Sequence, residues 1–210
     1  MDGFATVTEA AAGRCFAAGV APDRPGNADR FWARVSPPPP DTVVVATGGV
    51  GWRPPVPGST RSRVVDLLDW FSRPVVVAAG EVVTVWGADR AGVAVADHVA
   101  AAGHRVLLLT ADGELAPEAG PREKALMVRR LTENPNVEIR RETTLEAIEE
   151  DRLLLGHGGD REWCATRGPV VVAQGTVPRQ FEARGEWRTV VVDAATDAAE
   201  AIRWAARVSP

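Results

Sequence analysis

The chain has 210 residues, of which 45% are hydrophobic and 25% charged, so it can fill one sizeable core or two smaller ones without cross-links. Its formal net charge of -4 leaves no excess of cations to neutralise phosphates, which argues against nucleic acid as a partner. Cys15 and Cys164 lie far apart and outside any Cys-x-x-Cys pair, so we expect two free thiols and neither a zinc site nor a cysteine-ligated iron–sulfur cluster.

Residues 1–40 have no sustained hydrophobic period and end in the run Pro37 to Pro40, which suits neither a helix nor a central strand. They predict an N-terminal arm with one short helix near Asp29 to Val35. The start of the chain lacks the basic and apolar stretches of a secretion signal, and no segment approaches the ~20 apolar residues of a membrane span. We therefore expect a cytoplasmic protein without a membrane partner.

Short apolar runs after the arm predict alternating strands and helices. Thr42 to Ala46 is a β-branched run that ends at a Thr-Gly-Gly loop, as a buried strand would. Arg63 to Phe71 places apolar residues at helical spacing, and Pro74 ends the predicted helix. Val75 to Ala78 and Val82 to Trp86 are apolar runs separated by a glycine, and they predict two further strands.

The clearest unit of the sequence has the order strand, glycine loop, helix, strand. The strand Val82 to Trp86 leads into Gly87. A predicted helix of small and β-branched residues runs from Ala91 to Ala102, and Gly103 would end it. Arg105 to Thr110 is the next strand. This βαβ unit predicts two parallel strands joined by a right-handed crossover.

The remaining elements continue the α/β pattern. Helices are expected at Pro121 to Glu133 and at Asp193 to Val208. The remaining strands are expected at Val137–Arg140, Thr143–Ile148, Leu153–Leu155, Pro169–Ala173 and Thr189–Val192. The strands between residues 137 and 155 suggest an antiparallel hairpin region attached to the parallel sheet. The predicted fold class is α/β, with a parallel, Rossmann-like sheet.

The glycine loop is the one motif that can carry nucleotide chemistry. Such a turn binds a pyrophosphate when its first glycine permits a tight turn, its second lets the backbone approach the phosphates, and the helix offers free amides. Gly87 and Gly92 take the first and third positions, but Asp89 takes the second. At ~4 Å its carboxylate would repel a phosphate charge by roughly 1 kcal/mol in water-like surroundings, and by more where solvent is excluded. NAD(P) binding is therefore disfavoured, and Asp89 is expected to cap the helix.

Other candidate residues carry weaker signals. Asp112 is the acidic residue nearest the end of the second strand, where an acidic side chain would hold a ribose, but it comes slightly late. His98, His104 and His157 have no metal-ligand spacing, so no metal site is predicted. No residue stands in a motif that marks a catalytic acid, base or nucleophile. Seven tryptophans are many for this length, and those in predicted loops favour a protein-binding surface.

Several stretches together resemble the C-terminal FAD/NAD(P)-binding-type region of the old-yellow-enzyme-like 2,4-dienoyl-CoA reductase and trimethylamine dehydrogenase family. They are DTVVVATGG with RPPVPG, VVTVWGADRAGVAVADHVAAAGHRVLLLT with GELAPEAG, GPVVVAQGTVPR, and VVVDAATDAAEAIRWAA. The first is similar to the strand and loop that connect the FAD-type domain to an inserted NAD-type domain. The last is similar to the closing strand and helix of the FAD-type domain, with Asp193 in the place of its aspartate and Val192 in the place of its glycine.

This resemblance implies a division of the chain into three parts. Residues 1–40 would form the arm, and residues 41–79 with 165–210 a truncated FAD-binding-like domain. Residues 80–164 would form an inserted NAD(P)-type Rossmann-like domain of the glutathione-reductase type. If a nucleotide binds, the resemblance implies Gly87, Ala88 and Gly92 at its phosphates. It also implies that Thr47, Gly48 and Asp193 line a flavin-side cleft.

The departures from this family are also informative. Residues 1–40 show no strand followed by Gly-x-Gly-x-x-Gly, and the sequence shows neither the flavin-binding barrel nor the cluster ligands of the family. The branch that resembles trimethylamine dehydrogenase also tends to have a degraded loop in the inserted domain and passes electrons to another flavoprotein. We therefore expect a subunit of a split flavin-dependent oxidoreductase, with FAD or an ADP-type nucleotide shared with a partner that carries FMN or an iron–sulfur cluster.

Two alternatives stay open. The chain could be a non-catalytic scaffold or assembly module that kept the fold and has a degenerate nucleotide site. It could also be a free-standing NAD(P)H:flavin reductase, which would require the loop from Gly87 to Gly92 to work as a phosphate loop.

Overall fold

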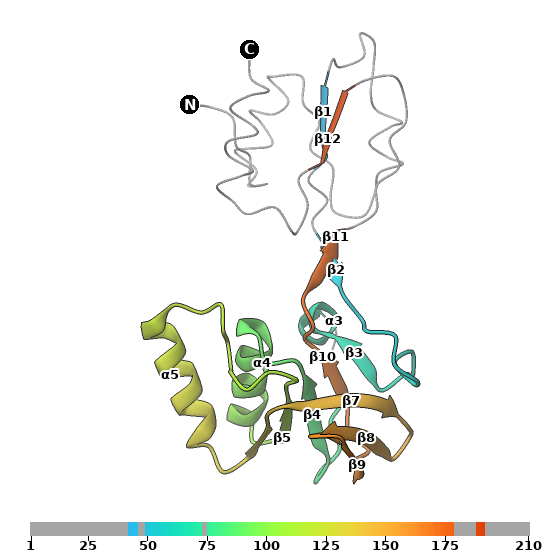
Figure 1. The fold of residues 1–210 in the computed structure, drawn as a ribbon, viewed down its shortest axis with the longest axis vertical. Helices are drawn as coiled ribbons and strands as arrows, with labels where there is room; N and C mark the ends of the chain where they lie inside the picture. Colours follow the sequence, from blue (N-terminus) through green and yellow to red (C-terminus); the bar gives the residue numbers. More distant parts are fainter. Residues whose placement is uncertain (1–41, 46–48, 73–74, 179–187, 192–210) are drawn as a thin grey trace. The chain divides into compact units, whose positions relative to one another are not determined.

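The computed structural model describes residues 42–45, 49–72, 75–178 and 188–191 (Figure 1). The chain divides into two compact units, one of residues 1–50 and 176–210 and one of residues 51–175. The predicted insertion, residues 80–164, lies within the second unit. The predicted arm and the two predicted helices near residues 29–35 and 193–208 lie outside the described residues. None of the described helices has the length and apolar character needed to cross a bilayer.

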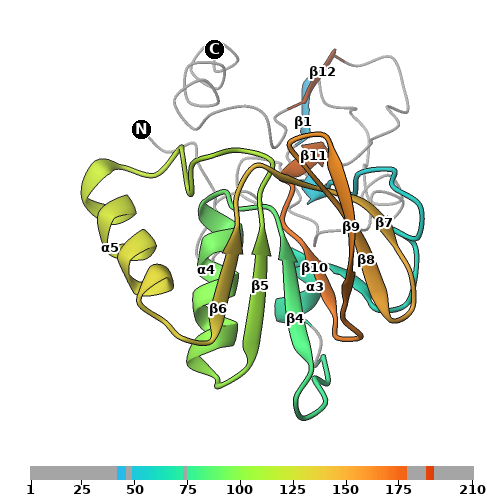
Figure 2. The same ribbon diagram turned by 60° about the horizontal axis from the view of Figure 1, so that its bottom comes forward.

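The unit of residues 51–175 is built on a five-stranded sheet in the order β3-β10-β4-β5-β6, and each neighbouring pair of strands is parallel. Its strands are β3 (Val64–Asp66), β4 (Val82–Trp86), β5 (Arg105–Leu109), β6 (Val137–Arg140) and β10 (Val170–Val172). Its helices are α3 (Leu67–Ser72), α4 (Arg90–Ala101) and α5 (Pro121–Thr132). Figure 2 shows β4, β5 and β6 running in the same direction. The predicted α/β class with a parallel, Rossmann-like sheet is confirmed.

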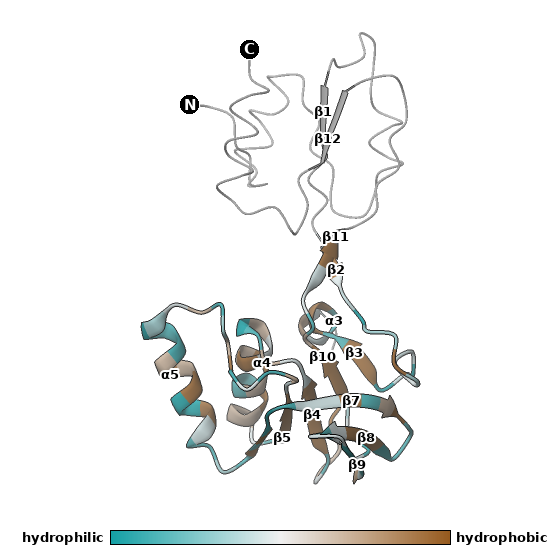
Figure 3. Cartoon of the chain, viewed as in Figure 1, coloured by the Kyte–Doolittle hydropathy of each residue, from teal (hydrophilic) through white to brown (hydrophobic). Residues whose placement is uncertain are grey.

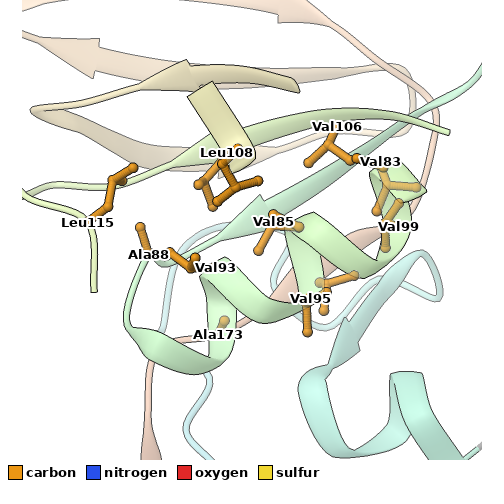
Figure 4. Packing of buried hydrophobic residues seen from close by; sticks show 14 of the residues in the cluster. Val83, Val85, Ala88, Val93, Val95, Val99, Val106, Leu108, Leu115 and Ala173 are labelled. Carbon is orange, nitrogen blue, oxygen red and sulfur yellow. The ribbon is translucent and has the colours of Figure 1, made fainter. Parts of the chain in front are cut away.

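The two faces of the sheet pack against different partners. Val83 and Val85 of β4 lie in one core with residues of α4, such as Val93 (Figure 4). Trp86 of the same strand and Leu109 of β5 lie in a second core on the opposite face. Burial on both faces explains why the central strands read as continuous apolar runs rather than as alternating patterns. In Figure 3 the central strands are accordingly mostly brown, while α5 carries hydrophilic teal.

A three-stranded antiparallel meander supplies the second core. Its strands β7 (Thr143–Ile148), β8 (Arg152–His157) and β9 (Asp160–Ala165) pair in sequence order. The predicted antiparallel region is thus confirmed for β7 and β8, whereas β6 belongs to the parallel sheet. The strand β9 was not predicted, because five of its six residues are exposed and its charged start resembles a turn.

Of two predicted elements between residues 63 and 78, the helix is confirmed only in its second half, which is α3, and the strand is wrong. The first half of the predicted helix Arg63 to Phe71 is strand β3, where Val64 pairs with Val170. Valines suit a strand as well as a buried helix, and the neighbouring strand β10 decides between them. The predicted strand Val75 to Ala78 has no regular structure, and Val76 is 87% exposed.

Two short parallel strands are described in the other unit, β1 (Thr42–Val45) and β12 (Arg188–Val191). They correspond to the predicted strands at residues 42–46 and 189–192. A further pair, β2 (Gly49–Gly51) with β11 (Thr176–Pro178), was not predicted, because three-residue strands leave no period in the sequence.

Candidate nucleotide-binding site

The glycine loop lies between the carboxyl end of β4 and the first turn of α4. Gly87 has a φ of +118°, and a Cβ there would lie 1.8 Å from the carbonyl oxygen of Ala173. A Cβ on Gly92 would lie 2.1 Å from the carbonyl oxygen of Gly87. Both positions therefore require glycine, the first for the tight turn and the second for close packing of the helix against it. The backbone keeps the geometry of a nucleotide-binding turn at these two positions.

Asp89 caps helix α4, as predicted. Its backbone is extended, with φ −63° and ψ 177°, and its Oδ1 accepts a hydrogen bond of 2.7 Å from the amide of Gly92. The nearby amide of Ala91 also favours the charged form of this carboxylate. Burial raises the pKa of the Asp89 carboxyl above its ordinary value, the nearby Glu118 carboxylate adds to the rise, and the amide hydrogen bonds oppose it.

Glu118 is a second carboxylate at the same helix end. The amide of Arg90 donates a hydrogen bond to Glu118 Oε1. The Arg90 side chain turns elsewhere, with its Nη2 2.7 Å from Glu123 Oε1 of α5. Sequence reasoning missed Glu118, because it lies 28 residues beyond Arg90 in a loop without a motif. The amides of Arg90 and Gly92 therefore both donate to carboxylates of the chain itself.

The end of β5 offers little to a ribose. Thr110 is buried, and its Oγ1 accepts a hydrogen bond of 3.1 Å from the amide of Asp112. The Asp112 side chain is exposed, and its carbonyl oxygen accepts from the amide of Glu142 at 3.3 Å. The role considered for Asp112 at a ribose stays a prediction.

The remaining candidate residues are dispersed. His98 contacts the ring of Phe71 at 5.7 Å between centroids, and His157 Nδ1 lies 3.0 Å from the Glu142 carbonyl oxygen. Within the described ranges, no group of three or more histidines, cysteines or carboxylates could hold a metal ion. Trp86 is buried, whereas Trp163 is 45% exposed beneath the Arg152 guanidinium.

A hollow of about 380 Å³ opens beside the meander, between the end of β6 and strand β9. Three arginines line it. Arg140 is paired with Glu138 and Glu162, and Arg161 with Glu146, so these pairs neutralise two of the three cations. Arg141 donates to the carbonyl oxygen of Gly113.

The candidate site residues thus divide into two sets. Gly87, Ala88 and Gly92 lie together at the turn, and the carbonyl oxygen of Ala88 accepts a hydrogen bond of 2.7 Å from the amide of Ala116. Their contact with phosphates stays a prediction. The proposed flavin-side residues Thr47, Gly48 and Asp193 lie outside the described residues.

The class of protein follows from comparison with known families. The profile of the pyridine nucleotide-disulphide oxidoreductases matches residues 38–202, and the chain belongs to this family. Membership implies binding of FAD, NAD(P) or both, and identifies a flavoprotein-type oxidoreductase domain. A search of curated proteins found no match to the sequence.

Solved structures with the same fold include a 2-naphthoyl-CoA reductase, at a TM-score of 0.63 and 22% identity over 78% of this chain. They also include the 6-hydroxypseudooxynicotine amine oxidase of Pseudomonas geniculata N1, at 0.60 and 24% over 76%. The bacillithiol disulfide reductase of Bacillus cereus aligns at 0.53 and 22% over 64%. The chain spans 24% of the length of each of the first two and 40% of the third. At these identities the likeness is one of fold.

The glycine loop does not fit NAD(P), although the family binds such cofactors. A dinucleotide pyrophosphate needs free amides at the helix start and a close approach to the second position of the loop. Here those amides already donate to Asp89 and Glu118. The loop therefore has the shape of a phosphate site but not its free donors.

Proposed function

We propose that this chain is a subunit of a split flavin-dependent oxidoreductase of the dienoyl-CoA reductase or amine dehydrogenase type. It supplies the nucleotide-binding-type domains, and a partner chain carries the FMN or iron–sulfur chemistry. The observation that carries this proposal is an oxidoreductase fold whose NAD(P) loop keeps its glycine geometry while its helix amides are taken. Such a domain is suited to a structural role in a flavoprotein, and not to hydride exchange with NAD(P).

The names of two structural relatives support the proposed type of reaction. They are named as a 2-naphthoyl-CoA reductase and a 6-hydroxypseudooxynicotine amine oxidase. The proposed cofactor is FAD or an ADP-type nucleotide, shared with the partner, with Thr47, Gly48 and Asp193 on the flavin side. FAD, when bound, would supply electron transfer to or from the partner.

Exposed apolar side chains in the unit of residues 51–175 support a protein partner. Leu68 and Phe71 of α3 are 47% and 58% exposed, and α3 buries none of its six residues fully. Apolar side chains gathered on one exposed segment are typical of surfaces that another chain covers. Helix α3, together with the exposed Val76, is therefore the proposed docking surface.

Co-expression tests the proposed function. The full chain, carrying an affinity tag, is produced together with each oxidoreductase subunit encoded beside it and then purified. We expect a stoichiometric complex with the visible absorption of a flavin, and dye reduction that requires both chains. A stable, colourless chain that retains no such subunit would contradict the proposal.

A second candidate function is a non-catalytic scaffold, which the self-occupied start of α4 favours. Mass spectrometry of the purified complex, with calorimetric titration of FAD and ADP, separates the two. Bound flavin, or saturable FAD binding, would count against the scaffold. A complex that forms without flavin and does not need this chain for dye reduction would favour it.

A further inference from the structure

The segment that follows β5, residues 110–120, folds back onto the glycine loop. We call it the closing segment. Its carboxylate Glu118 accepts from the amide of Arg90, next to the amide of Gly92 that donates to Asp89. Two carboxylates from different parts of the chain thus cover the first turn of α4. Each occupies a place where a dinucleotide phosphate oxygen would accept in an open site.

The middle of the closing segment is anchored in the core. Leu115 and Ala116 are 1% and 0% exposed, and Figure 4 shows Leu115 near Ala88 and Leu108. The amide of Ala116 donates to the carbonyl oxygen of Ala88, inside the glycine loop itself. The segment therefore cannot leave the loop without exposing apolar side chains and breaking this hydrogen bond.

The start of the closing segment is held by the corner between β6 and β7. The amide of Glu142 donates to the carbonyl oxygen of Asp112 at 3.3 Å, and Arg141 Nη1 donates to that of Gly113 at 2.8 Å. His157 supports this corner through its Nδ1, 3.0 Å from the Glu142 carbonyl oxygen. The start and the middle of the closing segment are thus both fixed.

Backbone strain marks the same two anchors. Ala116 and Glu142 have φ angles of 45° and 50°, and in the part of the chain that the structure describes they are the non-glycine residues with positive φ. A residue with a side chain adopts this region only where its surroundings hold it there. Both residues donate their backbone amides to hydrogen bonds that hold the closing segment. The strained backbone at these two residues therefore helps to keep the closing segment in place.

We propose that the closing segment is an internal substitute for a dinucleotide and that Asp89 and Glu118 together close this loop to NADH and NADPH. The two carboxylates satisfy the amides of α4 and repel an incoming pyrophosphate. Removing one leaves the other in place, so the loop opens only when both are removed. The inference bears on the cofactor of the proposed function and not on its partner, so binding and co-purification report on the two separately.

Nucleotide titration of the full-length protein tests the closure. The variants are Asp89→Gly, Glu118→Ala and their combination, and the matched control is Glu114→Ala. Glu114 lies in the same segment and is exposed, but it pairs with Lys124 and not with the helix amides. We expect no saturable NADH binding by the wild type or the control. The double variant should bind NADH about tenfold or more tightly than either single variant, since each remaining carboxylate still repels the phosphates.

Amide hydrogen exchange locates the effect and does not depend on the double variant. Glu118→Ala should speed exchange at Arg90 while leaving Gly92 protected, and Asp89→Gly should do the reverse. NADH added to the double variant should restore protection at residues 90–92, whereas binding in another part of the chain would not. If the double variant does not fold, amide exchange at Arg90 and Gly92 in the two single variants still tests whether Glu118 and Asp89 occupy these amides.

Any of three results would overturn the inference. One is saturable NADH binding by the wild type that protects residues 90–92. A second is a folded double variant that binds NADH no better than the wild type. A third is a Glu118→Ala variant with unchanged exchange at Arg90. An increase in binding shared by Glu114→Ala would show a general charge effect and would equally count against the closure.

Discussion

The amide of Gly92 donates a 2.7 Å hydrogen bond to Oδ1 of Asp89, so the residue that breaks the glycine loop also holds the start of helix α4. An aspartate at the second position of the glycine loop has two consequences. It removes a position where a phosphate could approach, and it supplies the cap that a helix start needs.

Loss of this cap should destabilise the unit of residues 51–175. Asp89→Ala is expected to lower the free energy of unfolding by about 1 kcal/mol, because a helix amide loses its acceptor. Asp89→Asn should change it little, since an amide oxygen can still accept from Gly92. Urea unfolding followed by circular dichroism measures both. Equal losses for the two variants would show that the charge matters and that the hydrogen bond does not.

The raised pKa of Asp89 predicts a pH dependence of stability. Because the folded pKa lies above its ordinary value of 3.8, the folded state holds this proton more tightly than the unfolded state. The contribution of Asp89 to the free energy of unfolding is therefore greatest below pH 3.8. It falls as the pH rises through the folded pKa and is constant above it. In Asp89→Asn this fall should disappear. Urea midpoints across the acidic range, compared between wild type and variant, test this; identical pH profiles would refute it.

Gly87 should tolerate no side chain. In Gly87→Ala the new Cβ would meet the Ala173 carbonyl oxygen at 1.8 Å, at a φ of +118°. We expect a loss of about 3 kcal/mol or more, because both the clash and the strained φ must be relieved. Gly103→Ala is the matched control: it has a φ of +89° but no atom within 4 Å of the new Cβ, and should cost about 1 kcal/mol. Thermal or urea unfolding measures the difference, and equal losses would mean that the clash relaxes freely.

The proposed docking surface on α3 and Val76 can be tested by polar substitution. Phe71→Ser should weaken the complex with the partner chain by about tenfold or more, because truncating a large anchor at an interface removes well over 1 kcal/mol. Leu126→Ser on α5 is the control, since Leu126 is 66% exposed but lies on another helix. Affinity is measured by calorimetry with the co-purified partner. An equal effect of the two substitutions, or none, would exclude this surface.

The β4–α4–β5 unit was predictable because its signals are local. The apolar run of β4, the small and β-branched residues of α4 and the helix-ending Gly103 all lie within one short stretch. The cap was predictable for the same reason, since Asp89 and Gly92 are three residues apart.

The wrong predictions share a different origin. Val64 belongs to a strand because its backbone pairs with that of Val170, which lies more than one hundred residues away in the sequence. The polar strand β9 exists because β8 pairs with it along its whole length. Neither pairing leaves a mark on the residues themselves, because backbone hydrogen bonds do not depend on side-chain type.

The sequence by itself determined the α/β class, the glycine turn at Gly87 and the conflict that Asp89 creates there, because turn geometry and charge act between near neighbours. Only the tertiary structure brought Glu118 to the amide of Arg90, because the loop of residues 110–120 must fold back on two strained anchors to reach it. The local sequence therefore determines the shape of the glycine turn, whereas the packing of distant segments determines whether its helix amides are free.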